Sequence, residues 1–414
     1  MHASIQKRLV EIVLLWTLVG YPLMGMYTTV TGVNNNTVSI IFRAFIVLIC
    51  LFLIWKAFAD KKFKTNKLIL VFLLLYFIRL IYDYAYQFND YALVAVQFYL
   101  SSVVIPVIAL GSYSEYILSI QKKVVFLISF SGAVFLPAFF YAYRNGLFYT
   151  QGTDEFNVRY ASEFVNAVLL GHFTCTVVIA AFFYMIEYRP RLIECAVHVA
   201  ILGGSVVALF LSGSRAAFVG VVVGSAVYAI SRPSRLVVLL PLVLGSLLYL
   251  PQDNFLVRRM GDLVSAQWDT GALQRMEVQS TAIGDFLNSP IIGKHFLDMN
   301  WGPGSYPHNI IIEILMALGL VGAVPLLLIF CMSIYRAMKF RSELTFYTII
   351  YLVSLTFQQT SGTIWAADNV FVLASILLTA NKNFEPRLLA RLPRRANAAQ
   401  RSIRAGMRQA DAQH

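Results

Sequence analysis

The sequence predicts an all-α polytopic membrane protein. Hydrophobic residues make up 58% of the 414-residue chain, only 13% are charged, and the mean hydropathy is +0.69. Soluble domains carry about a quarter charged residues. The apolar runs are long and continuous, whereas a transmembrane β-barrel would alternate apolar and polar residues over segments of about ten residues. Helices are therefore favoured, since each span must pair its own backbone groups inside hydrocarbon.

The apolar runs account for about twelve spanning helices of about 20 residues each. The expected spans are residues 9–29, 38–58, 68–86, 92–111, 124–143, 163–187, 193–211, 216–231, 236–250, 309–334, 344–360 and 367–381. The first run, from about Val10, lacks a small-residue cleavage site, so we expect it to remain as a span.

Four parts of the chain follow from this pattern. The parts are residues 1–250 with helices 1–9, the hydrophilic loop 251–308, residues 309–381 with helices 10–12, and the basic tail 382–414. The loop is the longest hydrophilic interruption of the chain, and it is expected to contain short helices and the residues of the functional site. The four cysteines, all inside expected helices, have no paired spacing and are interpreted as packing residues.

Lysine and arginine are concentrated on one side of the predicted bundle, which sets its orientation. With the N-terminus inside, the loops on that side hold Lys7, Arg8, Lys61, Lys62, Lys64, Lys67, Lys122, Lys123, Arg189, Arg191, Arg232, Arg235, Arg336, Lys339 and Arg341. The turns at residues 31–37 and 87–90 on the other side are almost uncharged. We therefore expect both termini in the cytoplasm and the loop 251–308 outside. The net charge of +12 then reflects topology and anionic lipid, not nucleic acid.

His308 is the first candidate for chemistry. It follows a Gly/Pro-rich run, residues 301–307, that breaks helices and favours a tight turn, and it precedes the span that begins near Asn309. An imidazole at the outer mouth of a helix can act as a general base, because its ordinary pKa lies near neutral pH. The alternative is an interfacial histidine that only caps the helix.

Arginines on the outer side form the second set of candidates. Arg215 lies in a short turn between two apolar spans, against the tendency of basic residues to stay inside. Arg275 lies in an expected amphipathic helix, and Arg258 and Arg259 begin the outer loop. A guanidinium group suits phosphate because its planar fork donates two hydrogen bonds at once. Contact with lipid headgroups or ordinary snorkelling remains an alternative for each of them.

Several charged residues fall inside the spans, where a charge costs about 2.5–3.5 kcal/mol at a helix centre. Arg79 and Asp83 are one helical turn apart and are predicted to pair in a structural role. Glu313 lies five residues after His308 and either lines a wet cavity below it or serves helix packing.

Other functional classes leave few traces in the sequence. The chain has no His-Glu-x-x-His motif for a zinc hydrolase. A carboxylate-pair glycosidase or an Asp-x-Asp metal-dependent glycosyltransferase would need paired acids, and the acids of the outer loops are mostly solitary. We expect no metal and no cofactor. A proton-coupled transporter would carry more buried acids and broken helices, although the glycines Gly203, Gly204 and Gly213 leave that class open.

Three motifs and one turn together resemble the O-antigen ligase and polymerase superfamily. The motifs are Asn288-Ser-Pro-Ile-Ile-Gly293, Tyr306-Pro-His308-Asn309 and Ala317-Leu-Gly319-Leu-Val-Gly322, and the turn is Ser212-Gly-Ser-Arg215. Ten residues separate His308 from Gly319, as in the ligases, and Arg275 stands where the superfamily has an arginine. About twelve helices with one large outer loop also fit the family, so the likeness covers most of the chain.

The resemblance implies a GT-C-like glycosyltransferase at the periplasmic face of the bacterial inner membrane. Such an enzyme moves polysaccharide from undecaprenyl diphosphate to the lipid A-core oligosaccharide, with inversion and without a metal. His308 would be the general base, and Arg215 and Arg275, helped by Arg258 or Arg259, would clamp the diphosphate, with Asn309 and Glu313 as further substrate-binding residues.

Three rival functions remain open at this stage. A polymerase of the same superfamily uses the same donor with another lipid-linked glycan as acceptor, and a protein O-oligosaccharyltransferase uses a protein. A lipid-linked glycan transporter is the alternative from a different class.

Overall fold

The structure is a computed structural model, and it describes residues 2–87, 90–151, 159–161, 165–232, 270–297 and 306–380. The predicted fold class is confirmed, since these residues are almost entirely helical. Eight of the described helical segments are long and apolar enough to cross a membrane, and the helices of residues 215–231 and 368–379 are apolar but shorter. The expected span 236–250 lies outside the described residues.

The first half of the chain forms helices joined by short turns. Its elements are α1 (His2–Leu15), η1 (Trp16–Gly20), α2 (Tyr21–Thr31), α3 (Asn35–Ala59), α4 (Lys67–Gln87), α5 (Asp90–Phe98), η2 (Tyr99–Val104), α6 (Ile105–Gly111), α7 (Ser114–Ser119) and α8 (Gln121–Arg144). Two expected spans, 9–29 and 92–111, are each a chain of three elements with a π-helical middle, η1 or η2.

The second half begins with a small departure from the all-helical expectation. Strands β1 (Tyr149–Gln151) and β2 (Arg159–Ala161) pair antiparallel, with Thr150 opposite Tyr160. The remaining elements are α9 (Ala167–Tyr188), α10 (Leu192–Ser212), α11 (Arg215–Ser231), α14 (Thr270–Asn288), α15 (Ile310–Lys339), α16 (Thr345–Thr360), η5 (Ile364–Ala366) and α17 (Asp368–Thr379).

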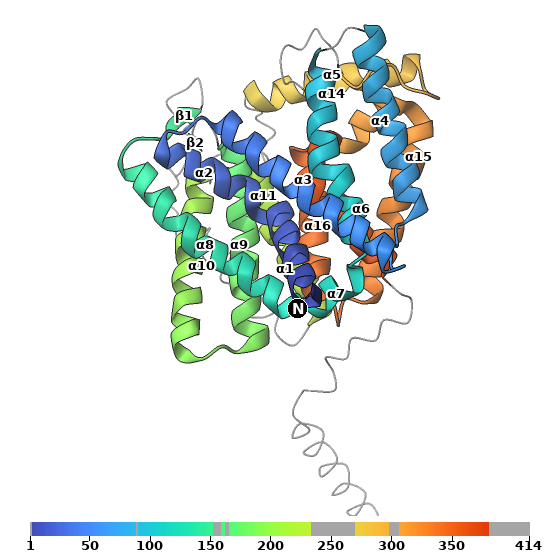
Figure 1. Ribbon diagram of the computed structural model, residues 1–414. Coiled ribbons are helices and arrows are strands. Elements are labelled where there is room, and N and C mark those ends of the chain that lie inside the picture. Colours follow the sequence, from blue (N-terminus) through green and yellow to red (C-terminus); the bar gives the residue numbers. More distant parts are fainter. Residues whose placement is uncertain are drawn as a thin grey trace, which may run out of the picture. The chain divides into compact units, whose positions relative to one another are not determined.

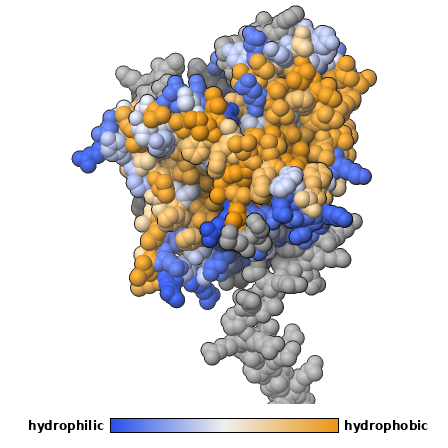
Figure 2. Space-filling model, in the orientation of Figure 1, coloured by the Kyte–Doolittle hydropathy of each residue, from blue (hydrophilic) through white to orange (hydrophobic). Residues whose placement is uncertain are grey.

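The helices have two hydrophilic ends and an apolar middle. The N-terminus, α7 and the turn between α9 and α10 lie at one end, and α14 and the β-ribbon lie at the other (Figure 1). Hydrophobic surface covers the middle in the view of Figure 2, with hydrophilic residues toward both ends. This arrangement fits a multi-pass membrane protein with α14 on the face away from the N-terminus.

Helix α15 is broken at Gly319, which has the non-helical torsions φ 55° and ψ −147°. In a regular helix the amides of Leu320 and Val321 would bond to carbonyls four residues earlier. Here they donate to the carbonyls of Pro290 and Ile291, at 2.9 and 3.0 Å. The Met316 carbonyl, freed in this way, accepts the amide of Lys294 at 2.8 Å. The turn after α14 therefore supplies the hydrogen bonds that the helix gives up.

The turn can approach α15 this closely only because Gly293 in the turn and Gly319 in α15 have no Cβ atom. A Cβ on Gly293, where φ is 70°, would lie 2.4 Å from the carbonyl carbon of Ala317. A Cβ on Gly319 would lie 2.5 Å from the Pro290 carbonyl oxygen. Both positive φ values also disfavour any residue with a side chain. The two glycine-containing motifs of the sequence therefore form a single backbone joint.

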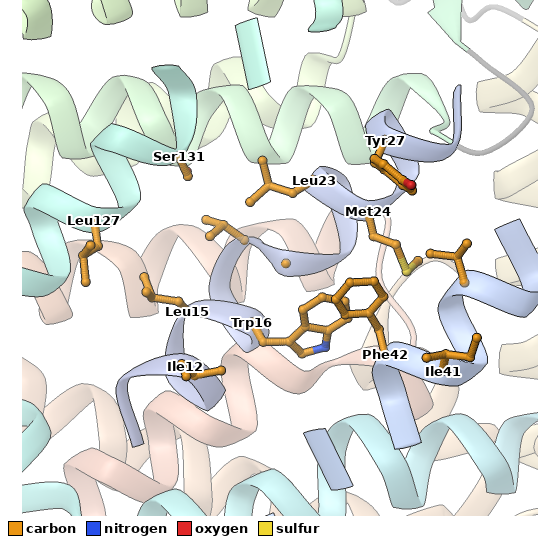
Figure 3. Close-up of a pocket in the computed structure, with 13 residues that line it drawn as sticks. Ile12, Leu15, Trp16, Leu23, Met24, Tyr27, Ile41, Phe42, Leu127 and Ser131 are labelled. Atoms are coloured by element: carbon orange, nitrogen blue, oxygen red, sulfur yellow. The ribbon is translucent and has the colours of Figure 1, made fainter. Parts of the chain in front are cut away.

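An apolar cavity of about 660 Å³ lies elsewhere, along the first spanning segment (Figure 3). Ile12, Leu15 and Leu23 of this segment line it, together with Phe42 of α3 and Leu127 of α8. Trp16 stacks on Phe42 with the ring centroids 5.2 Å apart. None of the predicted site residues lines this cavity, so it is separate from the candidate site.

We predict that Gly319→Ala lowers the stability of the protein by about 1–3 kcal/mol, because it strains the backbone and forces a Cβ against the Pro290 carbonyl. Thermal unfolding of the purified protein would measure the loss. Gly284→Ala is the matched control, since a Cβ there meets no heavy atom within 4 Å. Equal unfolding temperatures for the two variants would contradict the joint.

Candidate active site at the head of α15

His308 lies immediately before α15 in the left-handed region, with φ 57°. The next residue, Asn309, is the N-cap, and its side-chain oxygen accepts the amides of Ile311 and Ile312 at 3.0 and 3.1 Å. The His308 ring lies against Tyr306 with the centroids 4.2 Å apart. Among the residues that the structure describes, none hydrogen-bonds to its buried Nδ1 atom. Its backbone geometry is fixed, while one ring nitrogen is left for other chemistry.

The C-terminal end of α16 gathers three site residues. The last carbonyls of a helix have no partner within it and carry partial negative charge. Side chains from two other segments donate hydrogen bonds to these carbonyls. Asn309 Nδ2 donates to the Gln359 carbonyl at 3.2 Å. Arg275 Nη1 donates to the Thr360 carbonyl at 3.4 Å, and the Tyr306 hydroxyl donates to the Ser361 carbonyl at 3.4 Å. The structure therefore brings Arg275 and the His308 segment to the same helix end.

A direct link also joins α14 to the His308 segment. Gln279, one turn after Arg275 on α14, donates its side-chain amide to the Pro307 carbonyl at 2.9 Å. The Arg275 side chain of α14 is half-buried. The orientation of α14 and the position of His308 are thus coupled through Gln279 as well as through the end of α16.

Arg215 is the first residue of α11, which runs antiparallel to α16. A Cβ on Gly220 would touch Phe357, and one on Gly224 would touch Val353, so later positions in α11 face earlier positions in α16. Arg215 lies five residues before Gly220, and Thr360 lies three residues after Phe357. At about 1.5 Å per residue, the two differ by roughly 3 Å in height. Arg215 is therefore at the same end of the bundle as Arg275 and His308.

Burial, and to a lesser extent the positive charge of Arg275, lower the pKa of His308 to about 4, although a hydrogen bond with the Ser361 backbone acts in the opposite direction. The imidazole is consequently neutral at pH 7 and able to accept a proton.

Glu313 is buried, with an exposed fraction of 1%. It accepts the Tyr76 hydroxyl at 2.6 Å and the Ile364 amide at 3.2 Å. These contacts join α15 to α4 and to the segment after α16. Of its two expected roles, packing and a wet cavity, the packing role accounts for every contact that the structure gives it.

The end of α14 is held by two acid-base clusters. Asp285 binds Lys294 Nζ at 2.6 Å and His295 Nε2 at 2.7 Å. Burial alone would raise the pKa of Asp285, but the hydrogen bonds from Lys294 and His295, and the charges on both, hold it below its ordinary value. This cluster fixes the start of the turn that enters the break in α15.

The second cluster is the Arg79–Asp83 pair, which the structure confirms with a distance of 2.9 Å. Arg79 also donates to the Lys294 carbonyl, and Asp83 accepts the Phe296 amide at 2.6 Å. Asp83 is fully buried. The pair therefore clamps the far side of the same turn against α4.

His172 of α9, a histidine within an apolar run, is not among the site residues predicted from the sequence. Its ring stacks on Phe357 of α16 with centroids 3.8 Å apart. None of the described residues hydrogen-bonds to its buried Nε2 atom. The neighbouring Gly171 packs on Ser214, the N-cap of α11. A lone imidazole inside a spanning segment is the signal that could have pointed to it.

Tyr306 was named only as part of a motif and Gln279 was not predicted, because only the fold brings them to the end of α16 and to Pro307. Arg258 and Arg259 lie outside the described residues, and their role stays a prediction. Within the described ranges no group of three or more His, Cys, Asp or Glu residues could hold a metal ion.

We predict that protonation of His308 destabilises the fold between about pH 6.5 and 4. The folded protein holds the pKa near 4, whereas an unfolded chain would have about 6.5. Stability is therefore present above the unfolded pKa and is lost as the pH falls toward 4. Thermal unfolding from pH 7 to 4 would measure this loss, which should be smaller in His308→Asn. The same pH dependence in both proteins would show that His308 does not carry the effect.

The comparison with known families gives one match. Residues 198–327 match the model of the family described as O-Antigen ligase, and this range begins in α10 and ends within α15. No curated protein and no solved structure matches the chain. The family match confirms the resemblance stated above: over residues 198–327 the chain is similar to the O-antigen ligase family.

Proposed function

We propose that the protein is an O-antigen ligase. It would transfer polysaccharide from undecaprenyl diphosphate to a sugar of the lipid A core, at the periplasmic face of the bacterial inner membrane. The observation that carries the proposal is the meeting of a neutral imidazole and a guanidinium group at one helix end, His308 and Arg275 at the end of α16. The family match supports the reaction class.

The proposed transfer reaction requires two contributions from the protein. A lipid diphosphate is already a good leaving group, so the enzyme must neutralise the negative charge that develops as it departs. It must also remove one proton from the acceptor hydroxyl as that oxygen attacks the anomeric carbon. Attack from the face opposite the diphosphate inverts the anomeric configuration.

His308 is suited to take the proton. It is neutral at pH 7, and its Nδ1 atom has no partner among the described residues. A base of pKa about 4 is weak, but Arg275 contributes to that low value. A bound diphosphate would offset the charge of Arg275 and raise the pKa of His308 toward its ordinary value. Donor binding would thereby strengthen the base at the moment it is needed.

The arginines are suited to hold the diphosphate. Arg275 Nη1 donates to the Thr360 carbonyl at 3.4 Å, and a diphosphate oxygen would be a stronger, charge-assisted acceptor. Arg215 approaches from α11 at the same end of the bundle, and Arg258 and Arg259 are proposed helpers from the outer loop. Asn309 would hold the head of α15 in place below the substrate.

Replacing His308 should reduce transfer by about 10²–10⁴-fold, the usual contribution of a general base. His308→Ala removes the base, and His308→Asn removes it while tolerating the positive φ. Single-turnover assays with purified protein, lipid-linked donor and lipid A-core would measure the loss. Normal transfer by both variants would contradict the assignment.

Arg215→Lys and Arg275→Lys should also lower transfer clearly, because lysine keeps the charge but loses the two-pronged hydrogen bonding. Arg341→Lys is the matched control, since Arg341 is exposed beyond the C-terminal end of α15 and bonds only locally. The proposed mechanism uses no metal, so activity should persist in EDTA.

The acceptor separates the ligase from its rivals in the same assay. Covalent joining to lipid A-core supports a ligase, growth of the lipid-linked glycan supports a polymerase, and modification of protein supports an oligosaccharyltransferase. Movement of the donor across a membrane without joining would support a transporter. In cells, deletion should leave lipopolysaccharide as bare core while polymer accumulates on the lipid carrier.

A further inference from the structure

Helix α14 carries four exposed apolar side chains, which we call the apolar stripe, on the side away from the rest of the described protein. Leu273, Met276, Ile283 and Leu287 are between 43% and 68% exposed. Their spacing of three, seven and four residues puts all four within an arc of about 80°, at about 100° per residue. The stripe is roughly 21 Å long at about 1.5 Å per residue.

The face of α14 toward the rest of the protein carries buried and charged residues instead of exposed apolar ones. It carries the fully buried Ala282, the buried carboxylate Asp285 and the half-buried Arg275. At about 100° per residue, these three positions point away from the exposed stripe. The helix therefore turns its functional arginine inward and its apolar stripe outward.

The stripe continues into surface that belongs to a spanning helix. Ile291 and Ile292, in the turn after α14, are 65% and 63% exposed. The carbonyls of Pro290 and Ile291 bond to Leu320 and Val321. Exposed apolar side chains then follow along α15 at Leu320, Val321, Val324, Leu327 and Leu328. Since these α15 residues lie in a membrane span, lipid covers them, and the stripe on α14 is continuous with them.

The placement of α14 agrees with this continuity. Figure 1 shows the helix at the end of the bundle away from the N-terminus, lying across the direction of α4 and α15. A helix in that position runs along the plane of a membrane that α4 and α15 cross.

We propose that α14 is an interfacial membrane helix that buries Leu273, Met276, Ile283 and Leu287 in the leaflet opposite the N-terminus. Such helices sink their apolar face about 5–10 Å into the boundary between headgroups and acyl chains. The occupant of the stripe is therefore the hydrocarbon of the bilayer itself. Arg275, on the other face of the same helix, is held at the depth of the lipid headgroups.

A consequence for the reaction rests on the proposed function. A lipid-linked donor keeps its chain in the leaflet and its diphosphate at the headgroup level. An anchored α14 places Arg275 at that level, so the diphosphate can reach the site sideways from the membrane. The anchoring helix would then contribute to recognition of a lipid-linked substrate as opposed to a soluble nucleotide sugar.

Lipid quenching of a fluorescent label tests the anchoring. Full-length protein with its four cysteines replaced would be labelled at Met276→Cys or Ile283→Cys and placed in phosphatidylethanolamine/phosphatidylglycerol nanodiscs with acyl-brominated lipid. Gln274→Cys and Thr281→Cys are the controls, because both positions are exposed on the polar flank of α14. We expect quenching several-fold stronger at 276 and 283 than at 274 and 281.

Two results would overturn the proposal. Equal and weak quenching at all four sites, with labels open to water, would show that the stripe does not enter the membrane. Labels at 276 and 283 that are shielded from water but not quenched would show that a second copy or another protein covers the stripe.

Measurements of transfer activity distinguish failure of the membrane anchoring of α14 from failure of the proposed ligase function. Ile283→Glu should raise the KM for lipid-linked donor at least several-fold in nanodiscs, whereas Thr281→Glu should change it little. An unchanged KM in Ile283→Glu would contradict the proposed lateral route. Quenching at 276 and 283 in a protein with no transfer activity would leave the anchoring standing and remove the ligase function.

Discussion

The structure depends on a backbone joint between the turn after α14 and the break in α15 at Gly319. Hydrogen bonds that a continuous helix would make within itself are made instead between Pro290 and Leu320, Ile291 and Val321, and Lys294 and Met316. Buried backbone groups must be paired in an apolar environment, so the turn and the break require each other. The joint ties α14, which carries Arg275, to the helix whose head carries His308.

Side-chain contacts extend this joint to the rest of the site. The Arg79–Asp83 pair holds the turn from α4, and Gln279 holds the His308 segment from α14. The backbone carbonyls at the C-terminal end of α16 accept hydrogen bonds from the side chains of Arg275, Tyr306 and Asn309 and hold these residues in place. Burial and the charge of Arg275 act together here, since both lower the pKa of the neighbouring His308 imidazole and keep it neutral at pH 7.

Much of this could be predicted from the sequence, because its signals are local. Long apolar runs predicted the spanning helices, and the spacing of Arg79 and Asp83 predicted their pairing. The proline turn before Gly293 and the glycines near 319 stood out as motifs, but their meeting could not be predicted. It depends on hydrogen bonds between residues about thirty positions apart, and nothing in either motif specifies its partner. His172 was missed for the same reason, since its contact with Phe357 arises only when α9 packs on α16.

Crosslinking across the joint tests the account most directly. Ile291 and Val321 are joined by a backbone hydrogen bond of 3.0 Å, and a disulfide between their positions would require their Cα atoms to stay within about 7 Å of each other. In a background without native cysteines, the pair Ile291→Cys and Val321→Cys should crosslink within one chain under mild oxidation, and the crosslinked protein should keep the proposed transfer activity of the uncrosslinked one. A pair that stays reduced, or a crosslink that abolishes the transfer seen before oxidation, would contradict a joint that remains closed during the proposed reaction.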